Sequence, residues 1–578
     1  MRSSLLAAAT ILFCFQAAAA MQARRPNIIL IITDDQGHGD LGFHGNPKIR
    51  TPNIDKFAGE SVQFRRFYVS PVCAPTRASL MTGRYNYRTG VVDTYLGRAL
   101  MYPDEVTIAE MLAAAGYRTG IFGKWHLGDN YPMRPIDQGF QVSLVHRGGG
   151  IGQPSDPPGG ESYFDPILQR NGKAIKTAGY CSDVFTDAAL QFISDSREKP
   201  FFAYLAFNAP HTPLQVPESY HLPYSKMNLS PTEFPALGRP IEGDVPPDTT
   251  ARIYGMVTNI DDNLGRLFGK LDELGLSKNT IVIFMTDNGP QQSRYNSGMR
   301  GRKGSVYEGG TRVPFFVRWP GMLQAGLQVH RIAAHIDVAP TLLELCGVKR
   351  PVNVSFDGKS LLPLLKNEPD KWPDRSLYLQ WHRGDEPEAL RAFAVHTQSY
   401  KLVQPLGAAQ DVMPNNPKFE LYNVAEDPYE MHDLSSSHPE IVSTLLASYR
   451  AWFKDVGSTR GYAPSRAFLG TAHENPVILT RQDWRGPRAG WDPKSLGYWE
   501  VQVAQTGNFD ITLDFTPVAA ASRAHFLLQG VSRAQDLKPG ASECHWSGVR
   551  LSKGPGRLEA WIERDSETVG VTYVEIKK

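Results

Sequence analysis

The stretch Asn27-Ile-Ile-Leu-Ile-Ile-Thr33 decides the fold of this chain. It is a run of large apolar, mostly β-branched residues without alternating polar positions, which is typical of a strand buried on both faces of a parallel sheet. Residues 200–207 and 280–286 have the same character, and residues 117–122 read as a shorter strand. Segments of helical periodicity lie between these runs, the longest at 253–274. The sequence therefore predicts an α/β fold with a doubly wound, mostly parallel sheet.

Each of these runs is followed by polar side chains that can do chemistry. They are Asp34 and Asp35, Lys124 and His126, His211, and Asp287 and Asn288. Ligands of doubly wound sheets bind outside the carboxyl ends of the strands, so we expect these side chains to converge on one cleft. Any one cluster alone is more often structural, because Asp-Asn-Gly is a common turn and an isolated histidine is usually an ordinary surface or core residue. Four clusters in equivalent positions favour a functional site.

The acidic members of this set indicate a metal site. Asp34, Asp35, Asp287 and Asn288 offer only oxygen ligands. Hard oxygen donors suit Ca²⁺ or Mg²⁺, and the variable denticity of carboxylates suits Ca²⁺ better than octahedral Mg²⁺. The other candidates are cationic or can become so: Arg77, Lys124, His126, His211 and Lys303. A divalent metal among several cations describes a site that neutralises a tetrahedral oxyanion.

Cys73 opens the motif Cys73-Ala-Pro-Thr-Arg77, which is followed by Leu80-Met-Thr-Gly-Arg84. The pattern predicts a turn and then a helix, because Pro75 suits the first helical turn, where its missing N–H would be unpaired anyway. Cys73 would then lie at the helix N-terminus, where the dipole and the free N–H groups favour an anion. The alternative interpretation is a small buried apolar thiol.

The Cys73 motif resembles the signature of the type I sulfatases, a family of the alkaline-phosphatase superfamily. The resemblance covers about residues 25–455 and includes further matching segments. They are Asn27 to Asp35, Gly123-Lys-Trp-His126, Ala209-Pro-His-Thr-Pro213, Thr286-Asp-Asn-Gly289 and Arg300-Gly-Arg-Lys303. It implies an alkaline-phosphatase-like sulfatase core that hydrolyses sulfate esters of carbohydrates or aryl alcohols. Thr76 stands where many members have serine, which leaves the hydroxyl in place.

The resemblance also implies how the nucleophile and the metal are provided. A maturation enzyme oxidises the family's cysteine, here Cys73, to 3-oxoalanine (formylglycine), and the hydrate of this aldehyde is the nucleophile. The modified side chain binds Ca²⁺ together with Asp34, Asp35, Asp287 and Asn288. Mg²⁺ is the less favoured metal.

The same resemblance implies a role for each of the cationic residues. Arg77 and Lys124 are expected to hold formylglycine and sulfate, and His126 to assist the release of sulfate. His211 and Lys303 are expected to bind the sulfate and protonate the leaving alcohol.

The composition pattern changes near residues 456–480, after a catalytic region at 25–455 whose last part, about 375–455, reads as a smaller α+β subdomain. Beyond this point apolar residues alternate with polar ones, as at 509–515 and 558–562, which predicts a β-sandwich over 475–578. This accessory domain resembles a carbohydrate-binding module. Trp484, Trp491 and Trp499 are compatible with stacking on sugars, although tryptophans of a sandwich more often belong to its core.

Charge and length exclude some other functions. The chain has 578 residues, which suggests more than one domain, and 61 Lys+Arg against 59 Asp+Glu give no basic field. Neither nucleic acid nor a membrane surface is therefore indicated as a partner. Cys181, Cys346 and Cys544 lie far apart and imply no disulfide framework.

Residues 1–20 read as a cleaved signal peptide, with Arg2, an apolar core and small residues before the cleavage site. The alternatives are a membrane anchor, for which the apolar run is short, and lipid modification of Cys14, which the bulky Phe13 disfavours. We therefore expect a mature chain without a membrane span, exported to the periplasm or the medium.

Three segments are candidates for substrate contact: residues 146–164, with a Gly- and Pro-rich surface loop at 147–160, the region of Arg294, and Trp381-His382-Arg383. Two hypotheses compete with a secreted sulfatase. The first keeps the fold but hydrolyses phosphate diesters or phosphonate monoesters. The second is a non-catalytic glycan-binding protein that works through its sandwich.

Overall fold

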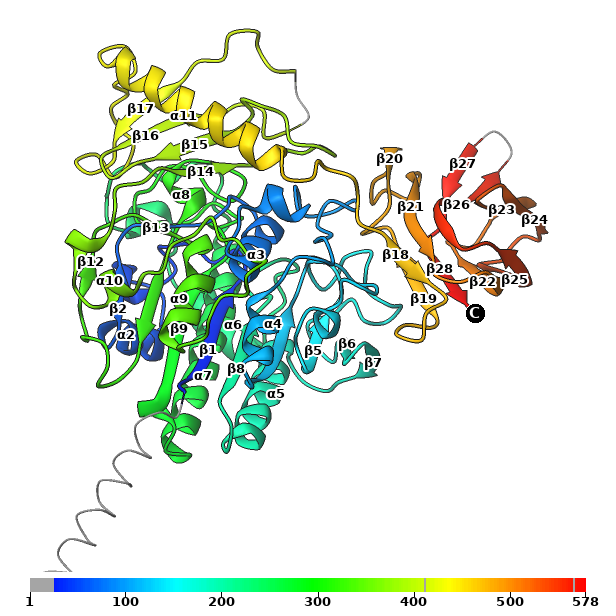
Figure 1. The fold of residues 1–578 in the computed structure, drawn as a ribbon, viewed down its shortest axis with the longest axis horizontal. Coiled ribbons are helices and arrows are strands. Elements are labelled where there is room, and N and C mark those ends of the chain that lie inside the picture. The colour runs from blue at the N-terminus through cyan, green and yellow to red at the C-terminus, as the bar shows by residue number, and fades with distance from the viewer. Residues whose placement is uncertain (1–24, 410–411, 565–566) are drawn as a thin grey trace, which may run out of the picture.

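The computed structural model describes residues 25–409, 412–564 and 567–578. The expected signal peptide at 1–20 lies outside these residues. A large α/β body carries a small sheet with a long helix at one end and a β-sandwich formed by the C-terminal residues (Figure 1). Among the described helices, none combines the length and the apolar character needed to cross a bilayer.

A ten-stranded mixed sheet forms the centre of the protein, with strand order β12-β2-β11-β9-β1-β8-β4-β5-β6-β7. Its middle strands, β9-β1-β8-β4-β5, are parallel, whereas β11, β6 and β7 pair antiparallel with their neighbours. The bounds are β1 Asn27–Thr33, β2 Val62–Phe64, β4 Arg118–Lys124, β5 Val142–His146, β6 Ile167–Arg170, β7 Lys173–Lys176, β8 Phe201–Ala206, β9 Thr280–Thr286, β11 Phe315–Arg318 and β12 Gln328–Val329. The predicted α/β class with a mostly parallel sheet is confirmed. Strands β5, β6, β7 and β12 were not predicted from the sequence, because they are short and, in β7, mostly exposed.

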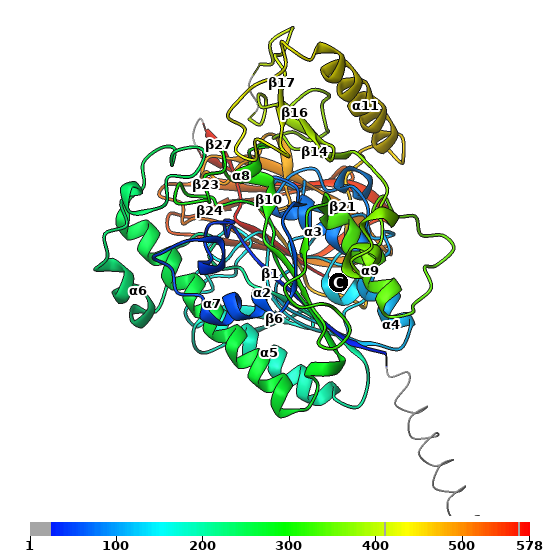
Figure 2. The same cartoon turned by 90° about the vertical axis from the view of Figure 1, so that its left-hand side faces the viewer.

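Helices cover both faces of this sheet (Figure 2). One face packs against α3 Cys73–Thr82, α4 Ile108–Ala114, α9 Val338–Leu345 and α10 Leu362–Leu365, and the other against α2 Pro52–Gly59, α5 Cys181–Ser196 and α7 Pro247–Glu273. In β1, Ile28 and Leu30 face the first core and Ile29 and Ile31 face the second. Burial on both faces explains why the sequence of β1 shows no alternation.

A four-stranded antiparallel sheet follows the central body, in the order β14-β15-β16-β17. Its strands are β14 Leu377–Gln380, β15 Phe393–His396, β16 Tyr400–Gln404 and β17 Glu420–Asn423, and helix α11 Pro439–Gly457 covers it. The Tyr449 ring of α11 stacks on Phe393 of β15 with 3.7 Å between the ring centroids. Three further strands, β3 Phe67–Tyr68, β10 Arg312–Val313 and β13 Ala333–Ala334, form a small sheet. The short helix α8 Glu308–Thr311 directly precedes β10, and α6 Glu218–Ser225 packs against α7.

The C-terminal residues form two sheets around one apolar core. One contains β18 Ala467–Leu469, β20 Arg485–Arg488, β21 Leu496–Val503, β23 Ser522–Leu528, β24 Val531–Leu537, β26 Gly554–Arg564 and β27 Glu567–Gly570. The other contains β19 Val477–Thr480, β22 Gly507–Asp514, β25 Glu543–Leu551 and β28 Tyr573–Lys577. The sandwich thus begins with β18, before the expected residue 475.

The three tryptophans singled out in the sequence have different surroundings. Trp484 and Trp499 are fully buried in the sandwich core, so the suggestion that they could stack on sugars is wrong for these two. Their rings pack together at 5.6 Å, and Trp499 Nε1 donates to the carbonyl of Thr480 at 2.7 Å. Trp491 lies in the loop between β20 and β21 and is 37% exposed.

Replacing Trp499 with alanine is expected to lower the free energy of unfolding of the sandwich by about 3–5 kcal/mol, because it leaves a large cavity in a close-packed core. Chemical denaturation followed by tryptophan fluorescence measures this. Trp561→Ala is a suitable control, because Trp561 is only partly buried and stacks on His525 at the surface. Equal losses in the two variants would contradict the assignment of Trp499 to the core.

Candidate active site

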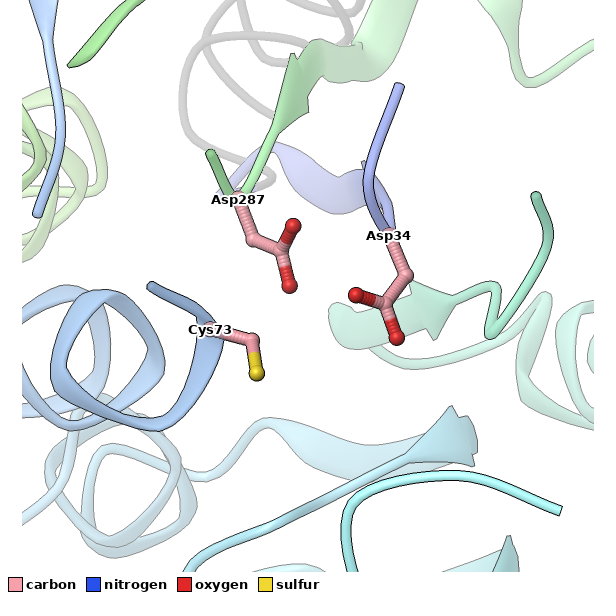
Figure 3. Close-up of side chains that lie close together, drawn as sticks. All are labelled: Asp34, Cys73 and Asp287. Atoms are coloured by element: carbon pink, nitrogen blue, oxygen red, sulfur yellow. The ribbon is translucent and has the colours of Figure 1, made fainter. Parts of the chain in front are cut away.

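The polar side chains that follow the parallel strands meet at one edge of the sheet. Asp34 follows β1 and Asp287 follows β9, and both side chains point toward Cys73 at the start of α3 (Figure 3). One carboxylate oxygen of each aspartate and the Cys73 sulfur all lie within 4.8 Å of one another. Lys124 ends β4, and His211 lies in the loop after β8. Strand topology therefore brings together residues that are up to about half the chain apart.

The carboxylate cluster has the properties of a metal site. Ligand atoms of Asp34, Asp35 and His211 also lie within 4.8 Å of one another. Within the described part of the chain, Asp34 Oδ1 and Asn288 Oδ1 are buried and accept no hydrogen bond. A buried oxygen left without a donor costs about 1–3 kcal/mol, so two such atoms at one place are suited to ligate a cation. The donor set, which is rich in carboxylate and amide oxygen, fits a hard divalent cation.

Each carboxylate is paired with a basic side chain. Lys124 Nζ lies 2.5 Å from Asp34 Oδ2, Lys303 Nζ lies 2.7 Å from Asp35 Oδ1, and Arg77 Nη2 lies 2.8 Å from Asp287 Oδ2. Burial, and next the charge of Asp34, raise the pKa of Asp287 to about 7. Burial also acts to raise the pKa of Asp35, but Lys303 and His211 together lower it below its usual range. Because three carboxylates and three cations cancel, an added divalent cation would leave net positive charge for an anionic substrate.

Cys73 is the first residue of α3 and is 2% exposed. Val72, in extended conformation, caps this helix without a side-chain hydrogen bond, so the first N–H groups of the helix are not capped by a side chain. Burial raises the pKa of the Cys73 thiol, although Lys124 and Lys303 act in the opposite direction. An unmodified Cys73 would therefore stay protonated at neutral pH and would be a poor nucleophile.

The two histidines of the site are oriented by backbone carbonyls and kept neutral by burial and by neighbouring lysines. His126 Nε2 lies 2.7 Å from the carbonyl of Thr94, and His211 Nδ1 lies 2.7 Å from the carbonyl of Thr212. Burial, then Lys124, lowers the pKa of His126 well below its usual value, and burial, then Lys303, lowers the pKa of His211 to about 3. The nitrogen bonded to a carbonyl carries the proton, which leaves the other nitrogen of each ring able to accept one.

A cavity of about 570 Å³ opens above these residues. It is lined by Cys73, His126, His211 and Lys303, and also by Thr94, Tyr95, Gly149, Gln153, Trp381, Arg383 and Trp491. Of the segment Trp381-His382-Arg383, which was expected to contact substrate, Trp381 and Arg383 line this cavity, whereas His382 is buried and does not. Thr94 and Tyr95 were missed, because no local pattern distinguishes the loop that carries them.

The structure differs from two sequence-based expectations about this region. Gln291, in the region of Arg294, lines the cavity that contains Cys73, but Arg294 itself does not: it is buried, with Nη2 2.6 Å from Asp40 Oδ2 and 2.9 Å from the carbonyl of Asp35. The loop at 147–160 was expected at the surface, yet residues 148–151 are buried. A Cβ at Gly149 would lie 2.7 Å from His126 Nε2, so this glycine allows the backbone to pack directly on the histidine.

The fold and the site define a hydrolase of the alkaline-phosphatase superfamily, built to bind a tetrahedral oxyanion. A family model described as sulfatase matches residues 26–348, and a model described as N-sulphoglucosamine sulphohydrolase, C-terminal, matches residues 302–449. The chain therefore belongs to the sulfatase family, and it is an enzyme that hydrolyses sulfate esters of carbohydrates or aryl alcohols.

Individual relatives agree with this assignment. Arylsulfatase A of Homo sapiens is 33% identical over 485 residues, which cover 74% of this chain and 88% of the relative. N-acetylgalactosamine-6-sulfatase of Mus musculus is 33% identical over 400 residues, which cover 64% and 70%. The crystal structure of Ps i-CgsB in complex with k-i-k-neocarrahexaose has a TM-score of 0.64 and 30% identity, covering 76% of this chain and 95% of that one. Both family models end by residue 449, before the sandwich.

Proposed function

We propose that this protein is a formylglycine- and Ca²⁺-dependent sulfatase that removes sulfate from a sulfated glycan. The observation that carries the proposal is the buried cluster of Asp34, Cys73 and Asp287, which is surrounded by paired cations and reaches a cavity through Cys73. The buried, protonated thiol of Cys73 supports its conversion to an aldehyde, because in that position the thiol itself is a weak nucleophile.

Asp34, Asp35, Asp287 and Asn288 would hold the metal, with the modified side chain of residue 73 beside them. The unpartnered oxygens of Asp34 and Asn288 support this assignment. When bound, a Ca²⁺ ion supplies positive charge that polarises a sulfate oxygen and lowers the pKa of the nucleophile. The aldehyde hydrate supplies two hydroxyl groups on one carbon, one to attack sulfur and one to expel the product afterwards.

The surrounding side chains would bind the sulfate and move protons. Arg77 and Lys124 are fully buried and fixed by their ion pairs, so they present positive charge without reorganisation. His126 Nδ1 is buried and unpartnered among the described residues, so it is the nitrogen of this ring that would take the proton of a hydroxyl at residue 73, once bound sulfate favours the protonated ring. Sulfate bound beside His211 favours its protonated form, and His211 with Lys303 then donates to the leaving oxygen.

Sulfated glycans are the favoured substrates because of the size of the cavity and the nature of the relatives. About 570 Å³ is far more than one sulfate group requires. One relative is an N-acetylgalactosamine-6-sulfatase, and one similar structure contains k-i-k-neocarrahexaose. A sugar substrate would place its sulfate at the floor and its ring against the aromatic walls.

The test is release of inorganic sulfate from a panel of sulfated mono- and oligosaccharides and an aryl sulfate, after co-expression with a formylglycine-generating enzyme. Mass spectrometry of the peptide containing residue 73 establishes whether the aldehyde is present. We expect release from at least one glycan. If the aldehyde-bearing protein released no sulfate but hydrolysed a phosphate diester or a phosphonate monoester, the choice of anion would be wrong.

A further inference from the structure

The C-terminal sandwich contributes one residue, Trp491, to the cavity that contains Cys73 and His211. Trp491 lies between β20 and β21, outside the part of the chain that the sulfatase family models match. Unlike Trp484 and Trp499, it is not part of the sandwich core, and 37% of it is exposed. A tryptophan that packs the core of neither domain needs another explanation.

The loop that carries Trp491 is held by hydrogen bonds to the residues directly before and after it, Gly490 and Asp492. Trp484 Nε1 donates to the carbonyl of Gly490 at 3.1 Å, and Arg481 Nη1 donates to the carbonyl of Asp492 at 2.9 Å. The N–H of Ser495 also donates to the Asp492 carbonyl, at 2.9 Å. The backbone on either side of Trp491 is therefore preorganised, so binding a ligand costs little ordering of the loop.

One of the places where the sandwich is attached to the catalytic body is residues 94–97, beside the active site. Leu96 is buried in the sandwich core, and the N–H of Gly97 donates to the carbonyl of Gln482 at 3.0 Å. Gln482 Nε2 donates to the carbonyl of Thr94 at 3.0 Å, and this is the carbonyl that His126 Nε2 contacts. The position of Trp491 is thus tied to the catalytic residues through a short series of direct contacts.

Trp491 lies in one wall of the cavity, together with two other aromatic rings and one cation. Its ring meets that of Tyr95 edge to face at 5.3 Å. The guanidinium of Arg383 lies 4.4 Å from the centre of the Tyr95 ring and 5.1 Å from that of Trp381. Arg383 is held by Asp93, at 3.0 Å, and its side chain remains 34% exposed. Aromatic faces bind the apolar faces of sugar rings, and an exposed guanidinium binds carboxylate or sulfate groups.

The geometry points to a second sugar subsite, formed by Trp491, Tyr95, Trp381 and Arg383, which binds the sugar next to the one that carries the scissile sulfate. The sandwich is then part of the active site and selects oligosaccharides over small sulfate esters. This inference rests on the proposed function, because it takes the Cys73 end of the cavity as the place of sulfate hydrolysis.

The experiment compares Trp491→Ala with the wild-type full-length protein carrying the aldehyde. The substrates are 4-nitrophenyl sulfate and sulfated oligosaccharides from carrageenan, chondroitin sulfate and heparan sulfate. We expect kcat/KM for the oligosaccharide that the wild type hydrolyses best to fall about tenfold, mainly through KM, because one stacking surface is lost. The value for 4-nitrophenyl sulfate should stay within about twofold. Trp561→Ala, a partly buried tryptophan of the same domain away from the cavity, should change neither.

A second measurement separates this inference from the proposed function. Calorimetry with the Cys73→Ala variant measures binding of the same oligosaccharides without turnover, with and without Trp491→Ala. Suppose that the wild type hydrolysed no sulfate ester, but that an oligosaccharide bound and Trp491→Ala weakened this binding. The proposed function would then fail, and the subsite would stand. The subsite would be overturned if Trp491→Ala lowered kcat/KM equally for both substrate types or for neither. It would also be overturned if the wild type neither bound nor hydrolysed any of the oligosaccharides.

Discussion

Replacing Cys73 with alanine is expected to lower kcat for sulfate release by at least about 10⁴-fold with every substrate of the wild type. The reason is that the variant cannot form the aldehyde, so no nucleophile remains at the start of α3. Substrate binding should persist, because Arg77, Lys124 and Lys303 are held in place by carboxylates rather than by Cys73. Steady-state release of inorganic sulfate measures the effect.

Two controls make this result specific. Cys73→Ala removes one sulfur atom from a helix that is buried along its whole length, so thermal denaturation should show that the variant remains folded. Cys73→Ser, checked by mass spectrometry to be unmodified, should support at most a single turnover, because one hydroxyl can attack sulfur but a second is needed to expel the product. Continuous turnover by Cys73→Ala would refute the formylglycine mechanism.

The second large effect is expected from Asp287→Asn, which removes one negative charge from the metal cluster. In the wild-type protein, Ca²⁺ at 100 times its Kd should stabilise the fold by about 2.7 kcal/mol, since the metal binds only the native state. This increment should be lost in the variant, together with at least about 100-fold in activity. The change in melting temperature on adding Ca²⁺ measures binding without reference to turnover.

The substitution also leaves Arg77 buried without its carboxylate partner, which by itself costs about 3–5 kcal/mol. Asn288→Ala is therefore a second test, because it removes an oxygen ligand without stranding a charge. Asp261→Asn is the matched control: Asp261 is a buried carboxylate on α7 that accepts hydrogen bonds from the N–H groups of Asn53 and Ile54. It should lose stability but keep the Ca²⁺ increment. A full increment in both Asp287→Asn and Asn288→Ala would contradict the metal site.

Much of the site could be predicted because its residues stand next to strands that the sequence marks clearly. The run before Asp34 and the run before Asp287 are apolar throughout, and both prove to be central strands of the sheet, β1 and β9. Once two parallel strands are recognised, topology dictates that the residues following them share one edge. The chemistry of the donors, oxygen ligands and cations, could then be read from residue types alone.

The surroundings of particular side chains could not be predicted in this way. Trp484, Trp491 and Trp499 look alike in the sequence, yet two are core residues and one faces the cavity. The difference depends on the partner sheet and on the loop at 94–97, both distant in sequence. Arg294 similarly looked available for substrate, but the buried Asp40 holds it.

The sequence by itself determined the α/β class, the polar residues that follow the central strands, and the cysteine motif. These are properties of single segments, because they depend only on periodicity and motif spacing. Only the tertiary structure decided which histidine nitrogens are available, which oxygens lack a partner, and that the sandwich reaches the active-site cavity. Those properties depend on burial and on contacts between segments distant in sequence, and no local pattern encodes them.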